Sequence, residues 1–90
     1  MTYFTTRPAL ARWLGTSAAR VRYAAKKYRV PHVAVVGNTC WYDARGALRI
    51  ALGMMWVAGR RRARTWEEGQ LRIRLHCAAI ILRYFADLSS

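Results

Sequence analysis

Residues 13–31 read WLGTSAARVRYAAKKYRVP, and this stretch decides the fold. Apolar residues recur at helical spacing before Gly15 and again after it, which predicts two short helices. Gly15 is suited to end the first helix because glycine readily adopts the left-handed backbone found there, and Thr16 or Ser17 can cap the second. Val30-Pro31 breaks the helical pattern. Two short helices joined by a Gly-Thr turn indicate a helix-turn-helix.

The flanking segments extend this unit on both sides. Thr6 can cap the first helix, and Pro8 suits its first turn, where the missing N–H would have no partner in any case. Residues 32–36 and 39–42 are β-favouring runs separated by Gly37-Asn38. Glycine at the first position of a two-residue loop favours a II′ turn, so these runs predict a β-hairpin.

Two further helices are expected. Asp43 can cap a third helix that begins at Ala44 and runs through Leu52, and Gly53 weakens its continuation. Residues 65–68 read TWEE, which is a capping box for a last helix over residues 66–88. The predicted class is therefore mainly α with a small β-hairpin, namely a winged helix-turn-helix plus a C-terminal helix.

The charge divides the chain into two parts. There are 16 Lys and Arg residues against 4 Asp and Glu residues, which gives a net charge of +12. In residues 65–90 three arginines are matched by three acids, so the whole excess lies in residues 1–64. Such a surface attracts polyanions. We expect residues 1–58 to form a DNA-binding winged helix-turn-helix domain, residues 59–64 a basic linker, and residues 65–90 a helix for packing or oligomerisation.

The order of these parts resembles the MerR-like winged helix-turn-helix of phage and transposon excisionases. The resemblance covers residues 3–52 and is carried by YFTTRPALARWLGTS, ARVRYAAKKYRVP, HVAVVGNTCWYD and ARGALRIAL. It implies that the second helix enters the major groove and that the wing approaches the neighbouring backbone or minor groove. It also implies a sequence-specific, DNA-bending protein of site-specific recombination or transcriptional regulation. The chain departs from the family at Pro8 and at its wing tip, which has no Arg or Lys.

The basic second helix carries the strongest functional signal, because five cations lie between positions 20 and 29 with no acid among them. Arginine suits guanine O6 and N7, lysine suits phosphate, and the first turns of a recognition helix usually meet the bases. Ser17, Arg20, Arg22 and Tyr23 are therefore expected at the bases, and Lys26, Lys27 and Arg29 at phosphates. The full set of predicted DNA contacts adds Thr16, Asn38, Arg60, Arg61 and Arg62.

The last helix carries two apolar stripes. One consists of Leu71, Leu75, Ala78, Leu82 and Phe85, and the other of Ile73, Cys77, Ile80, Tyr84 and Leu88. A helix that is apolar on most of its circumference must be covered on most sides. We assign the first stripe to oligomerisation, as a homodimer or a cooperative homo-oligomer. The alternative is that the helix serves only the core of its own chain.

Catalytic and metal-binding groupings are missing from the sequence. Cys40 and Cys77 have no zinc-ligand spacing with His32 or His76, and no nucleophile stands in a recognisable triad. We therefore expect no enzyme, no metal, no cofactor and no membrane span, since a span needs about 20 apolar residues. The expected protein is cytoplasmic and nucleoid-associated, with double-stranded DNA and an integrase as partners. A DNA-packaging subunit resembling small terminase subunits and a basic RNA-binding protein remain the alternatives.

Overall fold

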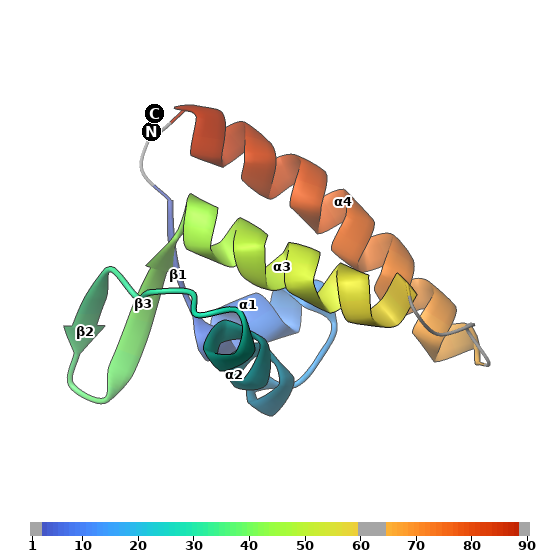
Figure 1. Ribbon diagram of the computed structural model, residues 1–90, viewed down its shortest axis with the longest axis horizontal. Coiled ribbons are helices and arrows are strands. Elements are labelled where there is room, and N and C mark those ends of the chain that lie inside the picture. Colours follow the sequence, from blue (N-terminus) through green and yellow to red (C-terminus); the bar gives the residue numbers. More distant parts are fainter. Residues whose placement is uncertain (1–2, 60–64, 89–90) are drawn as a thin grey trace.

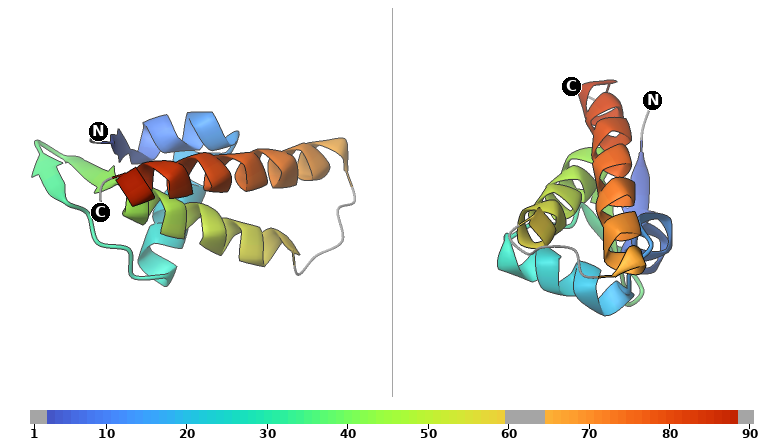
Figure 2. Two further views of the ribbon diagram at one scale, coloured as in Figure 1. Left: turned by 90° about the horizontal axis from the view of Figure 1, so that it is seen from above. Right: turned by 90° about the vertical axis from the view of Figure 1, so that its right-hand side faces the viewer.

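The computed structural model describes residues 3–59 and 65–88. Its elements are β1 (Phe4–Thr6), α1 (Arg7–Leu14), α2 (Ala18–Lys27), β2 (Ala34–Val36), β3 (Thr39–Asp43), α3 (Ala44–Gly59) and α4 (Trp66–Leu88). The two long helices α3 and α4 lie side by side, α1 and α2 pack beneath them, and the sheet lies at one end (Figures 1 and 2). The expected mainly helical class with a small antiparallel sheet is confirmed.

Local capping interactions fix the ends of α1 and α2. The backbone N–H of Ala9 donates to the Thr6 hydroxyl at 3.3 Å, and that of Arg20 donates to the Ser17 hydroxyl at 3.3 Å. Gly15 has a φ of 76°, the left-handed conformation that a helix C-terminus favours and that glycine adopts without strain. The predicted starts of both helices and the glycine-ended turn between them are confirmed.

The sheet has three antiparallel strands in the order β1-β3-β2. Strands β2 and β3 form the predicted hairpin, with Val36 opposite Thr39 and with Gly37 at a φ of 62°, as the first position of a II′ turn requires. Strand β1 pairs with the other side of β3, where Thr5 lies opposite Tyr42. This third strand was not predicted from the sequence. It connects the start of α1 directly to the hairpin.

Helix α3 is longer than predicted. The backbone N–H of Gly46 donates to the Asp43 carboxylate at 2.8 Å, which confirms the cap, but the helix continues through Gly53 to its end at Gly59. A Cβ atom at position 53 would overlap the Tyr28 ring, whose hydroxyl donates to the Gly53 carbonyl at 3.3 Å. Gly53 therefore allows α3 to approach the end of α2 closely and does not end the helix.

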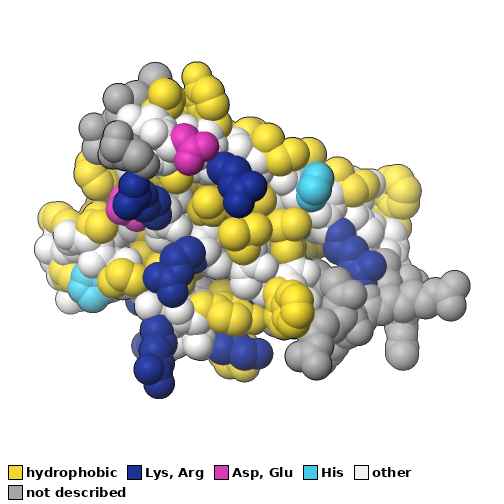
Figure 3. Space-filling view, turned by 45° about the horizontal axis from the view of Figure 1, so that its top comes forward, with side chains coloured by type: hydrophobic (Ala, Val, Ile, Leu, Met, Phe, Trp, Pro, Cys, Tyr) yellow, Lys and Arg dark blue, Asp and Glu magenta, His cyan; other side chains and the backbone are white. Residues whose placement is uncertain are grey.

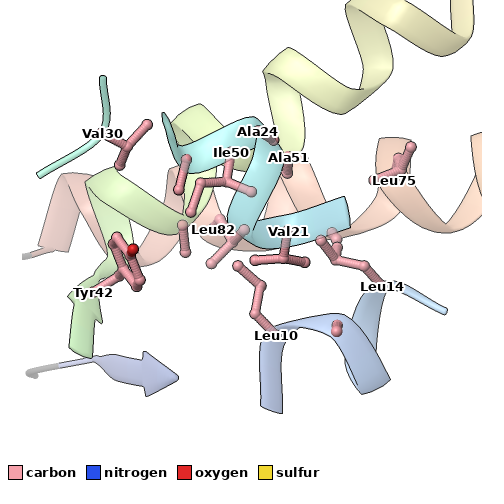
Figure 4. Close-up of a cluster of buried hydrophobic side chains, with 14 residues drawn as sticks. Leu10, Leu14, Val21, Ala24, Val30, Tyr42, Ile50, Ala51, Leu75 and Leu82 are labelled. Carbon is pink, nitrogen blue, oxygen red and sulfur yellow. The ribbon is translucent and has the colours of Figure 1, made fainter. Parts of the chain in front are cut away.

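The described part of the chain shares one core between α4 and the preceding elements (Figure 4). Its largest fully buried side chains are Tyr42, Leu10, Leu14, Ile50, Leu75, Leu82 and Val21. Leu75 and Leu82 belong to α4, which begins after Thr65, whose hydroxyl accepts the backbone N–H of Glu68 at 3.2 Å. Residues 65–88 thus contribute to the same core as the N-terminal elements, in the packing role that was one of the two expected for this helix.

Two polar and aromatic contacts join α4 to the N-terminal elements. The Arg74 guanidinium donates to the carbonyl of Trp13 at 2.9 Å and to that of Arg12 at 3.4 Å. It thereby supplies hydrogen bonds to carbonyls in the last turn of α1, which have no partner within the helix. Tyr3 stacks on Phe85 with ring centroids 5.4 Å apart. Burial raises the pKa of the Tyr3 hydroxyl above its usual value. The middle and the C-terminal part of α4 are therefore held against the end of α1 and the segment that precedes it.

Candidate nucleic-acid interface

An open groove of about 630 Å³ lies between the start of α1, the outer face of α2 and the tip of the β2–β3 hairpin. It is lined by Arg7, Pro8, Ala18, Ala19, Arg22, Tyr23, Lys26, Asn38, Thr39 and Cys40. Three of these residues are cations, and none of the described residues that line it is acidic. The groove therefore has the charge and the open shape to receive an extended anionic ligand.

Helix α2 contributes one side of this groove from its solvent face. Arg22 and Lys26 lie one turn apart, and Tyr23 lies beside them with 65% of its surface exposed. The opposite face carries Val21 and Ala25, which are buried in the core. Because the core fixes the rotation of α2, the groove face is held toward solvent. Three of the DNA contacts predicted from the sequence are thus brought together.

Two other predicted contacts on α2 lie elsewhere. Arg20 and Lys27 are exposed but do not line the groove. Two steps along a helix, as from Arg20 to Arg22, rotate a side chain by about 200°. Arg20 and Arg22 are therefore on opposite flanks of α2 and cannot both point into the groove. The Lys27 ammonium lies 5.9 Å from the centroid of the Tyr23 ring and 5.7 Å from that of the Tyr28 ring. Cation–π attraction holds it over the outer edge of the helix.

Arg7 is a groove residue that the sequence reasoning missed. Its Nε donates to the Tyr42 hydroxyl at 3.0 Å, and its Cζ lies 5.8 Å from the centroid of the same ring. Tyr42 is only 1% exposed, so a buried side chain fixes the guanidinium at the groove wall. A signal for this role exists in the sequence: a cation in the first turn of a helix opposes the macrodipole, so its presence there calls for another reason.

The hairpin contributes polar and apolar groups to the groove. Asn38 at its tip, one of the DNA contacts predicted from the sequence, lines the groove, and its amide can both donate and accept hydrogen bonds. Val33, Val35 and Val36 are exposed at 48%, 53% and 67% of their surface. The hairpin therefore offers an amide and an apolar surface to a ligand, and it places no cation at its tip.

The remaining predicted contacts do not line the groove or lie outside the described residues. The backbone N–H of Thr16 donates to the Ala11 carbonyl at 2.9 Å, and its hydroxyl is buried with no hydrogen-bond partner in the described part of the chain. The Ser17 hydroxyl caps α2 and is exposed. Arg29 is exposed and has a φ of 51°. Arg60, Arg61 and Arg62 lie outside the described residues.

The stripe of α4 assigned to oligomerisation needs correction. Leu75, Ala78 and Leu82 are buried in the core of their own chain, and Leu71 and Phe85 are half-buried beside it. The three buried side chains are therefore not available to a partner, and the two half-buried ones are partly covered by their own chain. The second stripe is the exposed one, and the difference arises because the alanines on the first side let α4 pack closely against its neighbours.

Neither a metal site nor a membrane span is found in the part of the chain that the structure describes. Among the described residues, no group of His, Cys, Asp or Glu side chains gathers closely enough to hold a metal ion. Within the same residues, no helix is long and apolar enough to cross a bilayer. No protein-family model, curated protein or solved structure significantly matches the chain. Its function is therefore inferred from the groove and from the order of its elements.

Proposed function

We propose that this chain is a duplex DNA-binding protein with a winged helix-turn-helix, in which α2 is the recognition helix and the β2–β3 hairpin is the wing. The observation that carries the proposal is the cationic groove between α2 and the hairpin, into which Arg7, Arg22 and Lys26 converge. The net charge of +12 supports the same conclusion, because only 4 Asp and Glu residues offset the 16 Lys and Arg residues of the chain.

In this proposal, some residues of the groove contact bases and others contact phosphates. With α2 in the major groove, Arg22 and Tyr23 meet base edges, and the small side chain of Ala19 lets the first turns approach the DNA closely. Arg7 and Lys26 neutralise phosphates along one strand. The groups at the hairpin tip, including Asn38, contact the sugar–phosphate backbone or the minor groove beside it.

The biological role follows from the resemblance of residues 3–52 to excisionases and MerR-like proteins. We propose a sequence-specific, DNA-bending factor that acts in site-specific recombination or transcriptional regulation, with an integrase as partner in the first case. A small protein of this kind changes the path of DNA without chemistry of its own, which agrees with the absence of a catalytic grouping in the sequence.

The test is a binding titration with a duplex taken from the DNA upstream of the gene and with a random duplex. Arg22→Ala should cost about 1–3 kcal/mol on the preferred duplex and less on the random one, as loss of a base contact does. Arg7→Ala should weaken both duplexes alike, as loss of a phosphate contact does. Arg12→Ala is the matched control, since it removes an exposed cation of α1 that does not line the groove.

Three outcomes would contradict this proposal. Equal losses for Arg12→Ala and Arg22→Ala would show that only net charge matters and that the groove does not bind DNA. Identical losses on both duplexes for Arg22→Ala would remove the sequence-reading role of α2. A single-stranded RNA that competes as well as the duplex would favour the RNA-binding alternative.

A further inference from the structure

The turn that ends α2 has an arginine at the position where glycine is usual. The backbone N–H of Val30 donates to the Ala25 carbonyl at 2.9 Å, and that of Arg29 donates to the Lys26 carbonyl at 3.2 Å. These two bonds form a Schellman motif, whose left-handed residue is most often glycine. Arg29 has that conformation, with a φ of 51°, which strains a residue that carries a Cβ atom. The fold alone would therefore favour glycine at this position.

Two further cations lie at the same turn. The Arg49 guanidinium, from α3, donates to the Tyr28 carbonyl at 3.0 Å, and the Lys27 ammonium lies 5.7 Å from the centroid of the Tyr28 ring. A helix C-terminus carries a partial negative charge, which Arg49 offsets. Because a guanidinium has five N–H donors, it can hold this carbonyl and an anion together. Lys27, Arg29 and Arg49 are all exposed, and we name these three residues the α2-end cluster.

The cluster begins on the flank of α2 that faces away from the groove. Lys27 follows Ala18, a groove residue, by nine positions, and nine steps of about 100° bring a side chain to the opposite side of a helix. Arg20 shares the flank of Lys27, since seven residues make about two turns. Figure 3 shows Lys and Arg side chains gathered on the lower left part of the molecule, with no Asp or Glu side chain among those drawn in colour there. Helix α2 therefore has exposed cations on both flanks.

We propose that the α2-end cluster binds phosphates of one DNA strand while Arg7 and Lys26 bind phosphates of the other, an inference that rests on the proposed function. The major groove is about 12 Å wide, so a helix lying in it has a sugar–phosphate backbone along each flank. Cations on both flanks of α2 match this arrangement, and cations on the groove side alone would serve one strand. The strained backbone of Arg29 is then explained by the charge that its side chain brings to the ligand.

The variant Arg29→Gly separates binding from folding, because the two should change in opposite directions. Glycine relieves the left-handed backbone, so the melting temperature should rise. The affinity for the preferred duplex should fall about 3- to 10-fold at about 0.1 M salt, and the salt slope should become shallower by about one unit. Arg29→Lys keeps the charge and should retain most of the affinity. An Arg29→Gly variant that binds as tightly as the natural chain would overturn the role of Arg29.

The variant Arg49→Gln tests the second member of the cluster, and it retains an amide N–H that can donate to a carbonyl. It should weaken duplex binding and reduce the salt slope as Arg29→Gly does. The matched control is Arg83→Gln, which removes one exposed cation of α4, a helix that contributes no residue to the groove lining. Equal losses for Arg49→Gln and Arg83→Gln would show that net charge alone is responsible and would overturn the site. Circular dichroism confirms that each variant retains its helices.

Neutral methylphosphonate linkages, placed one at a time in either strand of the preferred duplex, test the strand assignment. Neutralising a contacted phosphate should weaken binding of the natural chain. Arg49→Gln should remove this sensitivity at positions of one strand, and Arg7→Ala should remove it at positions of the other. The inference fails if both variants become insensitive at positions of the same strand.

These results also distinguish this inference from the proposed function. If Arg7→Ala and Arg22→Ala weaken duplex binding while Arg29→Gly and Arg49→Gln leave it unchanged, the groove binds DNA and only the second phosphate site is wrong. A natural chain that does not bind duplex DNA would overturn both.

Discussion

The contact between Arg7 and Tyr42 shows how a single buried hydroxyl can prepare a binding surface. Arg7 belongs to α1 and Tyr42 to β3, and the 3.0 Å hydrogen bond between them fixes a cation at the point where the helices meet the hairpin. A guanidinium that is already held in place loses less conformational freedom when it binds a phosphate. We therefore expect the Tyr42 hydroxyl to raise DNA affinity by holding the Arg7 guanidinium in place, an effect that is separate from the charge of Arg7.

The variant Tyr42→Phe tests this at constant net charge. It should cost the fold about 0.5–1.5 kcal/mol, the usual net value of one hydrogen bond, and it should also weaken binding to duplex DNA. Tyr28→Phe is the control, because it removes a hydroxyl whose bond to Gly53 lies away from the groove. It should lower the melting temperature without changing the DNA dissociation constant. Equal DNA affinities of the two variants would show that the Tyr42 hydroxyl does not position Arg7 for binding.

Among the elements, the approach of α3 to the end of α2 depends on one glycine. In an isolated helix Gly53→Ala would be stabilising by about 1 kcal/mol, because alanine has the higher helix propensity. Here the added methyl group would meet the Tyr28 ring, and we expect a net destabilisation of about 1–3 kcal/mol in urea unfolding. Gly69→Ala in α4 is the matched control, since nothing lies near the place of its Cβ atom, and it should stabilise. A stabilising Gly53→Ala would contradict the close packing of α3 on Tyr28.

The elements that could be predicted from the sequence are those specified by neighbouring residues. Caps at Thr6, Ser17 and Asp43 act within one turn, so the starts of three helices followed from local patterns. Strand β1 and the buried side of α4 depend instead on what lies opposite them in space. Both stripes of α4 are apolar, and no local rule ranks them. Four residues that line the groove were predicted from the sequence to contact DNA, namely Arg22, Tyr23, Lys26 and Asn38. The place of Arg7 in the groove could not be predicted, because it depends on the pairing of β1 with β3, which brings Arg7 to Tyr42.

At the scale of the whole molecule, two surfaces of different character lie on different layers of the fold (Figure 1). The groove beside α2 is cationic and open, and the exposed side of α4, with Ile73, Ile80 and Tyr84, is apolar and belongs to the neutral segment 65–90. The cooperative oligomer expected from the sequence stays a prediction, and copies that met through this apolar side of α4 would still present α2 to DNA. Neutralisation of the cationic bodies by DNA would strengthen the association, so we expect binding to adjacent sites to be cooperative in the natural chain and independent in Ile80→Glu.

The most direct test of duplex DNA binding through this surface is the salt dependence of affinity. If each protomer neutralises about 5–8 phosphates, the logarithm of the association constant should fall against the logarithm of salt concentration with a slope of about −5 to −7. The slope should become shallower by about one unit in Arg7→Ala and remain unchanged in Tyr42→Phe, which keeps the charge. A slope shallower than about −2 for the natural chain would contradict DNA binding through the cationic groove.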